Sequence, residues 1–357
     1  MKKFLFFVLA VMLIGSVTSL YADHAKLMPE NVGRVYIAPT YASQTQYFNK
    51  DGDRKFAERV ITSGSPQPVY EMWNIGLAVE HGVTSWMTAA LQWTPGYNIH
   101  SKVGTFGEAT DLNDMGDLFV GAKIQLVGNT ALLAPSEDIR FAFAPGIKVP
   151  LTKIDFSKEV SKANTPPAGS DDFTINKIDK HVLAAGWRLY FDYLFTKEFF
   201  VNFYNETIFY VQKAKAKNHS FGAATALASG SAAGLSIGDV DYKYQLTFEV
   251  EPNYTMEFTP KTTIEFGLPI SYVLNPAPEF GDISDNIGGA VAAGTKVAMK
   301  ETNPSSKVIT VKPTIGIFFM DWALPIEFKI GYFMPVWGKN ANATNTFSSQ
   351  IRVYYKI

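Results

Sequence analysis

Residues 242–258 read YKYQLTFEVEPNYTMEF, and this run gives the clearest indication of the fold class. All of its even positions, from Tyr242 to Phe258, are apolar or aromatic, and all of its odd positions, from Lys243 to Glu257, are polar or charged. A repeat of two is the side-chain period of a β-strand, whereas a helix would scatter both sets around its circumference. The run is longer than the usual strand of about 5–6 residues and long enough to cross a bilayer, which takes roughly 9–11.

The same alternation recurs along the chain. In residues 183–195, for example, Leu189 and Phe191 fall on one face and Arg188 and Asp192 on the other. We therefore expect twelve strands of this kind, at residues 33–43, 69–80, 84–97, 116–127, 138–149, 182–195, 198–212, 241–257, 262–274, 307–320, 324–336 and 345–357.

The connections between these segments alternate in length. Short links such as 81–83, 196–197 and 258–261 alternate with long ones such as 44–68, 150–181 and 275–306. Tight turns at one end and long loops at the other are typical of an antiparallel up-and-down transmembrane β-barrel. A soluble β-sandwich is the alternative, but its strands are shorter. The count could rise to 14 strands, because the loops 150–181, 213–240 and 275–306 could each hold another strand or hairpin.

A membrane accounts for other features of the sequence. Unpaired backbone groups are costly in hydrocarbon, so strands can span it only in a closed barrel. Prolines within the expected strands must then lie at bulges or strand ends; they are Pro39, Pro145, Pro252, Pro269, Pro313 and Pro325. Aromatic residues near strand ends suit the membrane interfaces; they are Trp86, Trp93, Tyr97, Tyr242, Tyr254, Trp322 and Trp337.

The N-terminus has the pattern of a cleavable signal peptide over residues 1–22. Lys2 and Lys3 precede an apolar run, and mostly small residues follow up to Ala22. The mature chain would then be a single barrel domain, 23–357. No later stretch approaches the ~18 consecutive apolar residues of a membrane helix.

Composition narrows the function. The formal net charge is -1, which gives no indication of a nucleic-acid partner. Cysteine is absent, so disulfides, thiolate metal sites and a thiol nucleophile are excluded. His219 and Ser220 are adjacent, but neighbours on a strand point apart, and no other grouping suggests catalysis. We expect no enzyme activity, no cofactor and no metal.

The last strand carries the most specific motif. Apolar or aromatic residues occupy alternate positions up to the end, at Ile351, Val353, Tyr355 and Ile357. In this the chain resembles the outer-membrane β-barrels of double-membraned bacteria, whose terminal strand is recognised by the barrel assembly machinery. Their usual last residue is Phe, and here it is Ile357. The resemblance implies location in the cell outer membrane, among its lipids, and a porin or channel function.

Fatty-acid transporters are a second, weaker resemblance, in size and loop rhythm. They carry an N-terminal hatch with an Asn-Pro-Ala element. Here about ten residues, Asp23 to Val32, precede the first strand, and the Asn275-Pro276-Ala277 triplet lies in a distal loop.

Charged residues on the polar faces are the candidate pore lining. Assigned by alternation, they are Arg34, Lys123, Arg140, Lys148, Arg188, Glu206, Glu249, Glu251, Glu257, Glu265, Lys312, Glu327, Lys329 and Arg352. A basic group, from Arg34 to Arg188, lies largely on the fourth to sixth strands, and an acidic group, from Glu206 to Glu265, lies on the seventh to ninth. Lys312, Glu327, Lys329 and Arg352, with Lys356, form a third, mixed group. Opposed basic and acidic walls would create a transverse field. The alternative is that opposite charges pair and fill the lumen. Barrels of about eight strands are filled and those of about sixteen form channels, so twelve leaves both open.

The leading hypothesis is a porin-like channel for passive diffusion of small polar solutes. A surface-exposed structural or adhesive barrel and a transporter of hydrophobic compounds are the alternatives. The sequence leaves open the solute, the position of the long loops and the oligomeric state, a homo-oligomer included.

Overall fold

The structure is a computed structural model that describes residues 24–56, 70–103, 110–111, 115–151, 182–214, 236–237, 239–281, 283–284 and 304–356. The expected signal peptide, 1–22, and Ile357 lie outside these residues. Among the residues described, no helix is long and apolar enough to span a membrane.

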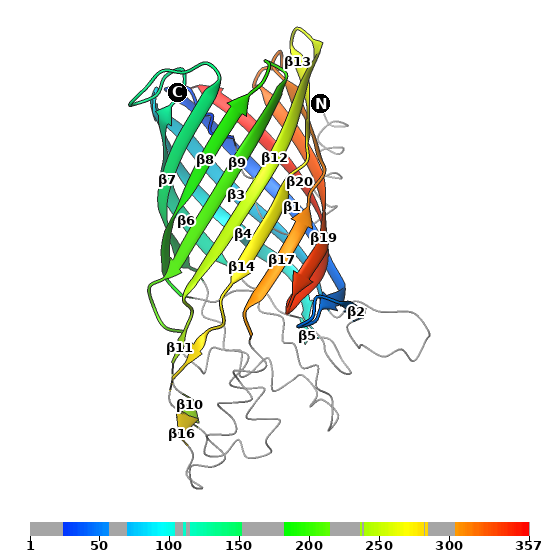
Figure 1. Cartoon of the computed structure of the whole chain (residues 1–357). Helices are drawn as coiled ribbons and strands as arrows, with labels where there is room; N and C mark the ends of the chain where they lie inside the picture. The colour runs from blue at the N-terminus through cyan, green and yellow to red at the C-terminus, as the bar shows by residue number, and fades with distance from the viewer. Residues whose placement is uncertain are drawn as a thin grey trace.

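The described chain forms one closed antiparallel barrel of twelve strands, two of them interrupted (Figure 1). The wall runs in chain order: β1 (Val32–Phe48), β3 (Tyr70–Thr84), β4 (Met87–Val103), β6 (Asp117–Val127), β7 (Ile139–Pro150), β8 (Ala184–Leu194), β9 (Phe199–Tyr210), β12 (Tyr244–Thr259), β13 with β14 (Thr262–Gly267, Ile270–Asn275), β17 with β18 (Ser306–Val311, Thr314–Phe319), β19 (Ile326–Lys339) and β20 (Ala341–Lys356).

The first and last strands close the wall. β20 pairs with β1 from Val32↔Lys356 to Phe48↔Ala341, which leaves no unpaired edge. Six further strands of two or three residues lie outside this count: β2 (Arg54–Phe56), β5 (Thr110–Asp111), β10 (Ser236–Ile237), β11 (Val240–Asp241), β15 (Glu279–Phe280) and β16 (Ile283–Ser284). In the described chain, β10 forms a two-stranded sheet with β16 and β11 forms another with β15, both separate from the wall, so the expected count of twelve rather than 14 is confirmed.

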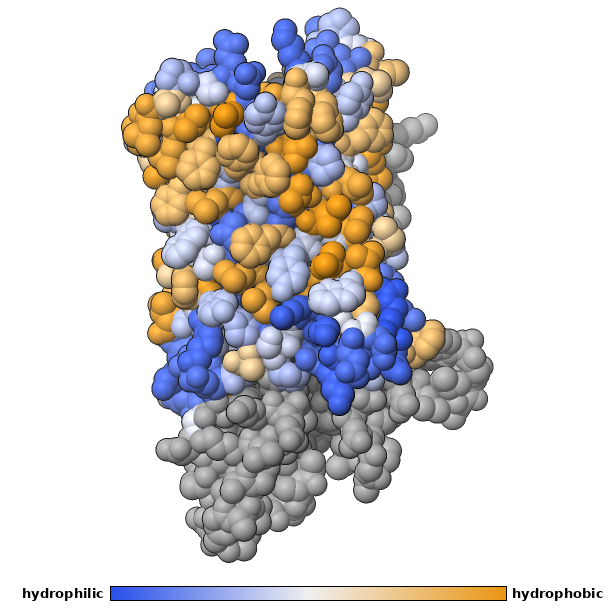
Figure 2. Space-filling view, in the orientation of Figure 1, coloured by the Kyte–Doolittle hydropathy of each residue, from blue (hydrophilic) through white to orange (hydrophobic). Residues whose placement is uncertain are grey.

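The alternation places apolar side chains outside and polar ones inside. In β12, Phe248 and Val250 are 49% and 41% exposed, while Glu249 and Glu251, which alternate with them, are buried in the interior. Figure 2 shows a broad hydrophobic band across the face of the barrel in view, with hydrophilic residues gathered near its ends. This arrangement is the reverse of a soluble β-sandwich, whose apolar faces point inward.

The strand prolines lie where the ladder is interrupted. Pro39 pairs with Ile75 of β3, while the pairing of β1 with β20 lapses between Ile37 and Thr40. Pro269 and Pro313 occupy the gaps between β13 and β14 and between β17 and β18. A proline has no N–H to donate, so each of these sites loses a ladder bond that an ordinary residue would make.

One end of the barrel, the short-turn end, carries tight links such as 85–86, 195–198 and 260–261. The opposite end, the long-loop end, carries the connections 49–69, 104–116, 151–183, 211–243 and 276–305. The expectation of a loop over residues 337–344 is wrong. β19 and β20 continue through it and turn at Asn340 alone, whose φ of 48° is the left-handed conformation that asparagine tolerates.

The aromatic girdle is present in part. Tyr254 and Trp337 are exposed on the outer face. Tyr242 is instead buried, and it packs with Val182, Ala214 and Val240 at the long-loop end. The expectation that Tyr242 lies at the membrane interface is therefore wrong. The side chain of Tyr97 lies outside the described part.

Candidate functional site

The interior wall of the barrel is lined by charged side chains that pair locally. Within the described residues, seven ion pairs with N···O separations of 2.5 to 3.7 Å lie on the inner face: Arg34–Glu80, Arg140–Asp192, Lys148–Asp117, Arg188–Glu206, Lys312–Glu249, Lys329–Glu265 and Arg352–Glu327. Four of these pairs, Arg34–Glu80, Arg140–Asp192, Arg188–Glu206 and Arg352–Glu327, join residues that are directly opposite in register on neighbouring strands.

The structure brings thirteen of the fourteen candidate pore-lining residues together on the inner face. Glu257 has the same strand parity but is exposed at the short-turn end of β12. Lys123 Nζ donates to the His24 carbonyl oxygen at 2.9 Å and lies 4.1 Å from the centre of the Tyr190 ring.

Opposed charge walls are not what the interior contains. Arg188 of β8 and Arg140 of β7 each lie against a carboxylate of the neighbouring strand, Glu206 and Asp192. Paired opposite charges largely cancel each other's field beyond short distances, so the expectation of a transverse field is wrong for this conformation. The candidate pore-lining residues predicted from the sequence do not include two of these partners, Asp192 and Glu80. Both lie on the polar faces of their strands, so the alternation of polar and apolar residues could have identified them.

A chain segment not predicted to contribute to the interior occupies the short-turn end of the lumen. Residues 24–31, here called the N-terminal segment, precede β1, and Ala25 and Leu27 within it are buried. The main-chain N–H of Ala25 donates to both carboxylate oxygens of Asp192 at 3.1 Å. Its carbonyl oxygen accepts a hydrogen bond from Gln125 Nε2 at 3.1 Å.

Further contacts fix the N-terminal segment along its length. The Met28 N–H donates to Thr88 Oγ1 at 3.0 Å, and the Asn31 N–H donates to the Gly82 carbonyl at 2.9 Å. A Cβ at Gly82 would lie 2.1 Å from the Pro29 carbonyl oxygen, so only glycine allows this close approach. The segment is therefore held by groups from several strands of the wall.

His24 begins the described chain and lies among acidic groups of the wall. Its Nε2 is 3.3 Å from Glu265 Oε2, and its ring meets Phe200 edge-on with centroids 4.5 Å apart. Burial lowers the pKa of His24, but the carboxylate of Glu265 and its hydrogen bond outweigh this, helped by Asp192 and Glu251. The net result is a pKa raised above the ordinary 6.5, which favours the imidazolium.

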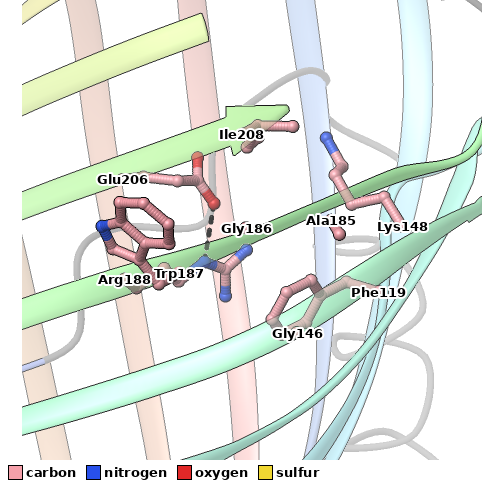
Figure 3. Close-up of a pocket in the computed structure, with 9 residues that line it drawn as sticks. All are labelled: Phe119, Gly146, Lys148, Ala185, Gly186, Trp187, Arg188, Glu206 and Ile208. Atoms are coloured by element: carbon pink, nitrogen blue, oxygen red, sulfur yellow. Dashed lines mark hydrogen bonds and ion pairs between the residues drawn. The ribbon is translucent and has the colours of Figure 1, made fainter. Parts of the chain in front are cut away.

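A second cluster lies around Arg188, nearer the long-loop end. Arg188 donates to Glu206 Oε1 and to Gln92 Oε1, both at 2.7 Å, and its guanidinium carbon is 4.0 Å from the centre of the Phe119 ring. Figure 3 shows Arg188, Glu206 and Phe119 at a small pocket that they help to line. The Phe119 ring lies against Gly146, where a Cβ would come within 2.3 Å of it.

The described residues of the terminal motif, Ile351, Val353 and Tyr355, lie on the outer face of β20. Tyr355 pairs in register with Gly33 of β1, and a Cβ at Gly33 would lie 2.2 Å from the tyrosine ring. Ile351 pairs with Ile37, and Val353 with Val35. The motif therefore lies at the seam that closes the barrel. Its recognition by the assembly machinery stays a prediction.

Together, the closed wall, the apolar exterior and the polar interior define an outer-membrane type of β-barrel. Scans of known protein families and of characterised proteins find no match for this chain. Among solved structures it is similar to an outer-membrane channel from Pseudomonas putida F1, with a TM-score of 0.55 and 10% identity over 95% of this chain and 100% of that one.

Weaker likenesses are to the NanC porin and to the toluene transporter TodX of P. putida. The TM-scores are 0.39 and 0.37, each at 9% identity, over 91% and 94% of this chain and 100% and 93% of those chains. At such identities the similarity to the Pseudomonas channel establishes the fold alone.

Proposed function

We propose that this chain is an outer-membrane channel for passive diffusion of small polar solutes. The observation that carries the proposal is the polar inner surface of a closed barrel. Beyond the ion pairs, buried uncharged polar side chains line the wall toward the long-loop end: Thr40, Gln44, Asn74, Thr346, Ser348 and Gln350. Such groups exchange hydrogen bonds with water and polar solutes, whereas a route for hydrophobic compounds requires an apolar lining.

The orientation follows the usual rule for such barrels, in which tight turns face the periplasm and long loops face the exterior. The short-turn end, with the N-terminal segment, then faces the periplasm. The hydrophobic band contacts outer-membrane lipid, and the solutes enter from the long-loop end. In this arrangement the conformation described here is a narrow state, because the N-terminal segment lies across the periplasmic half of the lumen.

The N-terminal segment gives the proposal a sharp test. Purified, folded protein in a planar lipid bilayer is expected to give discrete conductance steps. A variant lacking residues 24–29 keeps all twelve strands and is expected to conduct more, because the lumen loses its inserted chain. Migration in electrophoresis before and after boiling checks that both proteins hold a stable barrel.

Two outcomes decide between functions. If heat-modifiable barrels of both the full chain and the deletion variant pass no current, and liposomes containing them exclude small sugars and ions alike, the channel proposal is wrong. A structural or adhesive barrel would then be favoured. Binding of an apolar compound without conductance would favour the transporter of hydrophobic compounds.

A further inference from the structure

Glu251 is the exception among the carboxylates buried on the inner wall. It is 0% exposed, and neither carboxylate oxygen has a hydrogen-bond partner. The other inner carboxylates described above form ion pairs; Glu249, its neighbour on the same face, lies 2.7 Å from Lys312 Nζ. A fully buried carboxylate without a counter-charge is costly, so this position calls for a positive partner.

The nearest cationic side chains contact a different carboxylate. Lys329 Nζ is 3.2 Å from Glu265 Oε1, and His24 Nε2 is 3.3 Å from the other oxygen of the same group. Neither cation forms a hydrogen bond with the Glu251 carboxylate, whose two oxygens have no partner. Glu251 therefore lies close to the Glu265 cluster but lacks a direct ligand of its own.

Other oxygen atoms gather beside Glu251. Asn253 is 1% exposed; its amide nitrogen donates to the Glu251 carbonyl at 2.9 Å, and its Oδ1 has no partner. Asn202, the register partner of Glu251 on β9, donates its amide to Asp192 at 2.7 Å, and its Oδ1 is also without a partner. In both residues the amide nitrogen has a partner, which leaves the oxygen as the free group.

Gly267 of β13 shows how closely these atoms converge. A Cβ placed there would lie 2.6 Å from Thr314 Oγ1, 2.7 Å from Glu251 Oε1 and 2.9 Å from Asn253 Oδ1. Three oxygens from two strands, β12 and β18, thus lie within 3 Å of one point. Carboxylate, amide and hydroxyl oxygens are the ligands that hard cations take. A proton on Glu251 could form one hydrogen bond, whereas a cation contacts several oxygens together.

We propose that Glu251, Asn253 and Thr314, with Asn202 across the strand pair, form a binding site for one monovalent metal cation on the lumen wall. The single formal charge of Glu251 matches a single positive charge, and a divalent ion would have only one carboxylate to balance it. The site stands on this cluster of oxygens and does not depend on conduction through the barrel.

The test measures binding in detergent. Folded protein is titrated with NaCl or KCl at constant ionic strength, with N-methyl-D-glucamine chloride as the replacement salt. The urea midpoint of unfolding and the linewidth of the sodium-23 resonance are followed. We expect the small cation to raise the midpoint and the protein to broaden the sodium line, because the cation binds only the folded barrel.

Three variants define the site. Glu251→Gln keeps the shape and removes the charge, and Gly267→Ala places a methyl group among the oxygens; both are expected to abolish the dependence on cation identity. Thr314→Val keeps every charge and is expected to weaken it. The matched control is Glu257→Gln, which removes a carboxylate from the exposed end of the same strand and should leave the dependence unchanged.

The proposal is overturned if the midpoint follows ionic strength but not the identity of the cation. A response to CaCl2 alone, or an unchanged response in Glu251→Gln, would do the same. A response to pH alone would show that Glu251 holds a proton instead. If Glu251→Gln and Gly267→Ala do not fold, Thr314→Val and the sodium linewidth of the unaltered protein decide the question. None of these readings requires conductance, so the channel proposal fails or holds independently.

Discussion

Asp192 of β8 accepts the main-chain N–H of Ala25 with both of its carboxylate oxygens, at 3.1 Å each, although 167 residues separate the two in sequence. Asp192 is 0% exposed and also contacts Asn202 and Arg140. Asp192 thus holds the main chain of the N-terminal segment rather than a side chain, so a residue without an N–H at position 25 would lose this anchor.

Ala25→Pro removes the donor in this contact and is expected to release the N-terminal segment, with larger conductance steps or longer openings. The cost of losing a hydrogen bond to a charged acceptor is about 1.5–3 kcal/mol. Planar-bilayer recordings check this. Lys26→Ala, at the exposed neighbouring position, is the control. Equal conductance in all three proteins would contradict a blocking role for the segment.

The position of the segment can also be followed chemically. The natural chain has no cysteine, so a single cysteine at Leu27 labels this buried position alone. In the folded barrel, a thiol at Leu27→Cys is expected to react slowly with a water-soluble maleimide. Adding Ala25→Pro should accelerate the reaction. Fast labelling in the single variant would show that residue 27 is not held inside the lumen.

Conductance is expected to depend on pH through His24. The pKa of His24 is raised in the folded barrel, so the His24–Glu265 pair contributes its full stabilisation below pH 6.5, the ordinary value. That contribution is lost as the pH rises through the folded pKa. Open probability should therefore increase with alkaline pH, and His24→Gln should remove that step. A pH profile that is the same in His24→Gln would assign the titration to another group.

Arg188→Glu is expected to shift ion selectivity toward cations, because it would place two carboxylates side by side with Glu206 on the inner wall. Breaking a buried pair typically costs about 3–5 kcal/mol, so the barrel should also be less stable. Reversal potentials under a salt gradient measure the first effect and urea unfolding the second. The charge-swapped double variant, Arg188→Glu with Glu206→Arg, should recover stability. Unchanged selectivity would remove Arg188 from the conduction path.

The outer face can be tested with two adjacent residues of β12. Phe248 points outward and is 49% exposed, whereas Glu249 points inward. Phe248→Arg is expected to destabilise the barrel in lipid by about 2–4 kcal/mol, the cost of arginine near the bilayer midplane. Phe248→Leu should cost far less. Folding yield in lipid vesicles, read from electrophoretic mobility without boiling, provides the comparison. Equal yields would mean that this face does not contact hydrocarbon.

The strands and their two faces can be predicted from the order of residues without any tertiary contact. Residues 242–258 alternate with a period of two, and that pattern is local, so it can be read without knowing any partner strand. The inward positions of Glu249 and Arg188 and the outward position of Phe248 followed from it. The breaks at Pro269 and Pro313 followed too, because proline cannot donate to a ladder wherever it lies.

The ion pairs on the inner wall and the position of the N-terminal segment in the lumen depend on how the strands are assembled. Arg188 pairs with Glu206 because of the register between β8 and β9, and a shift of register would give each a different partner. His24 and Ala25 carry no periodic signal, since their anchors come from β6, β8 and β13 and depend on the closure of the whole barrel. Side-chain period is a property of a single strand, whereas a lumen site is made by several strands brought together only when the wall closes.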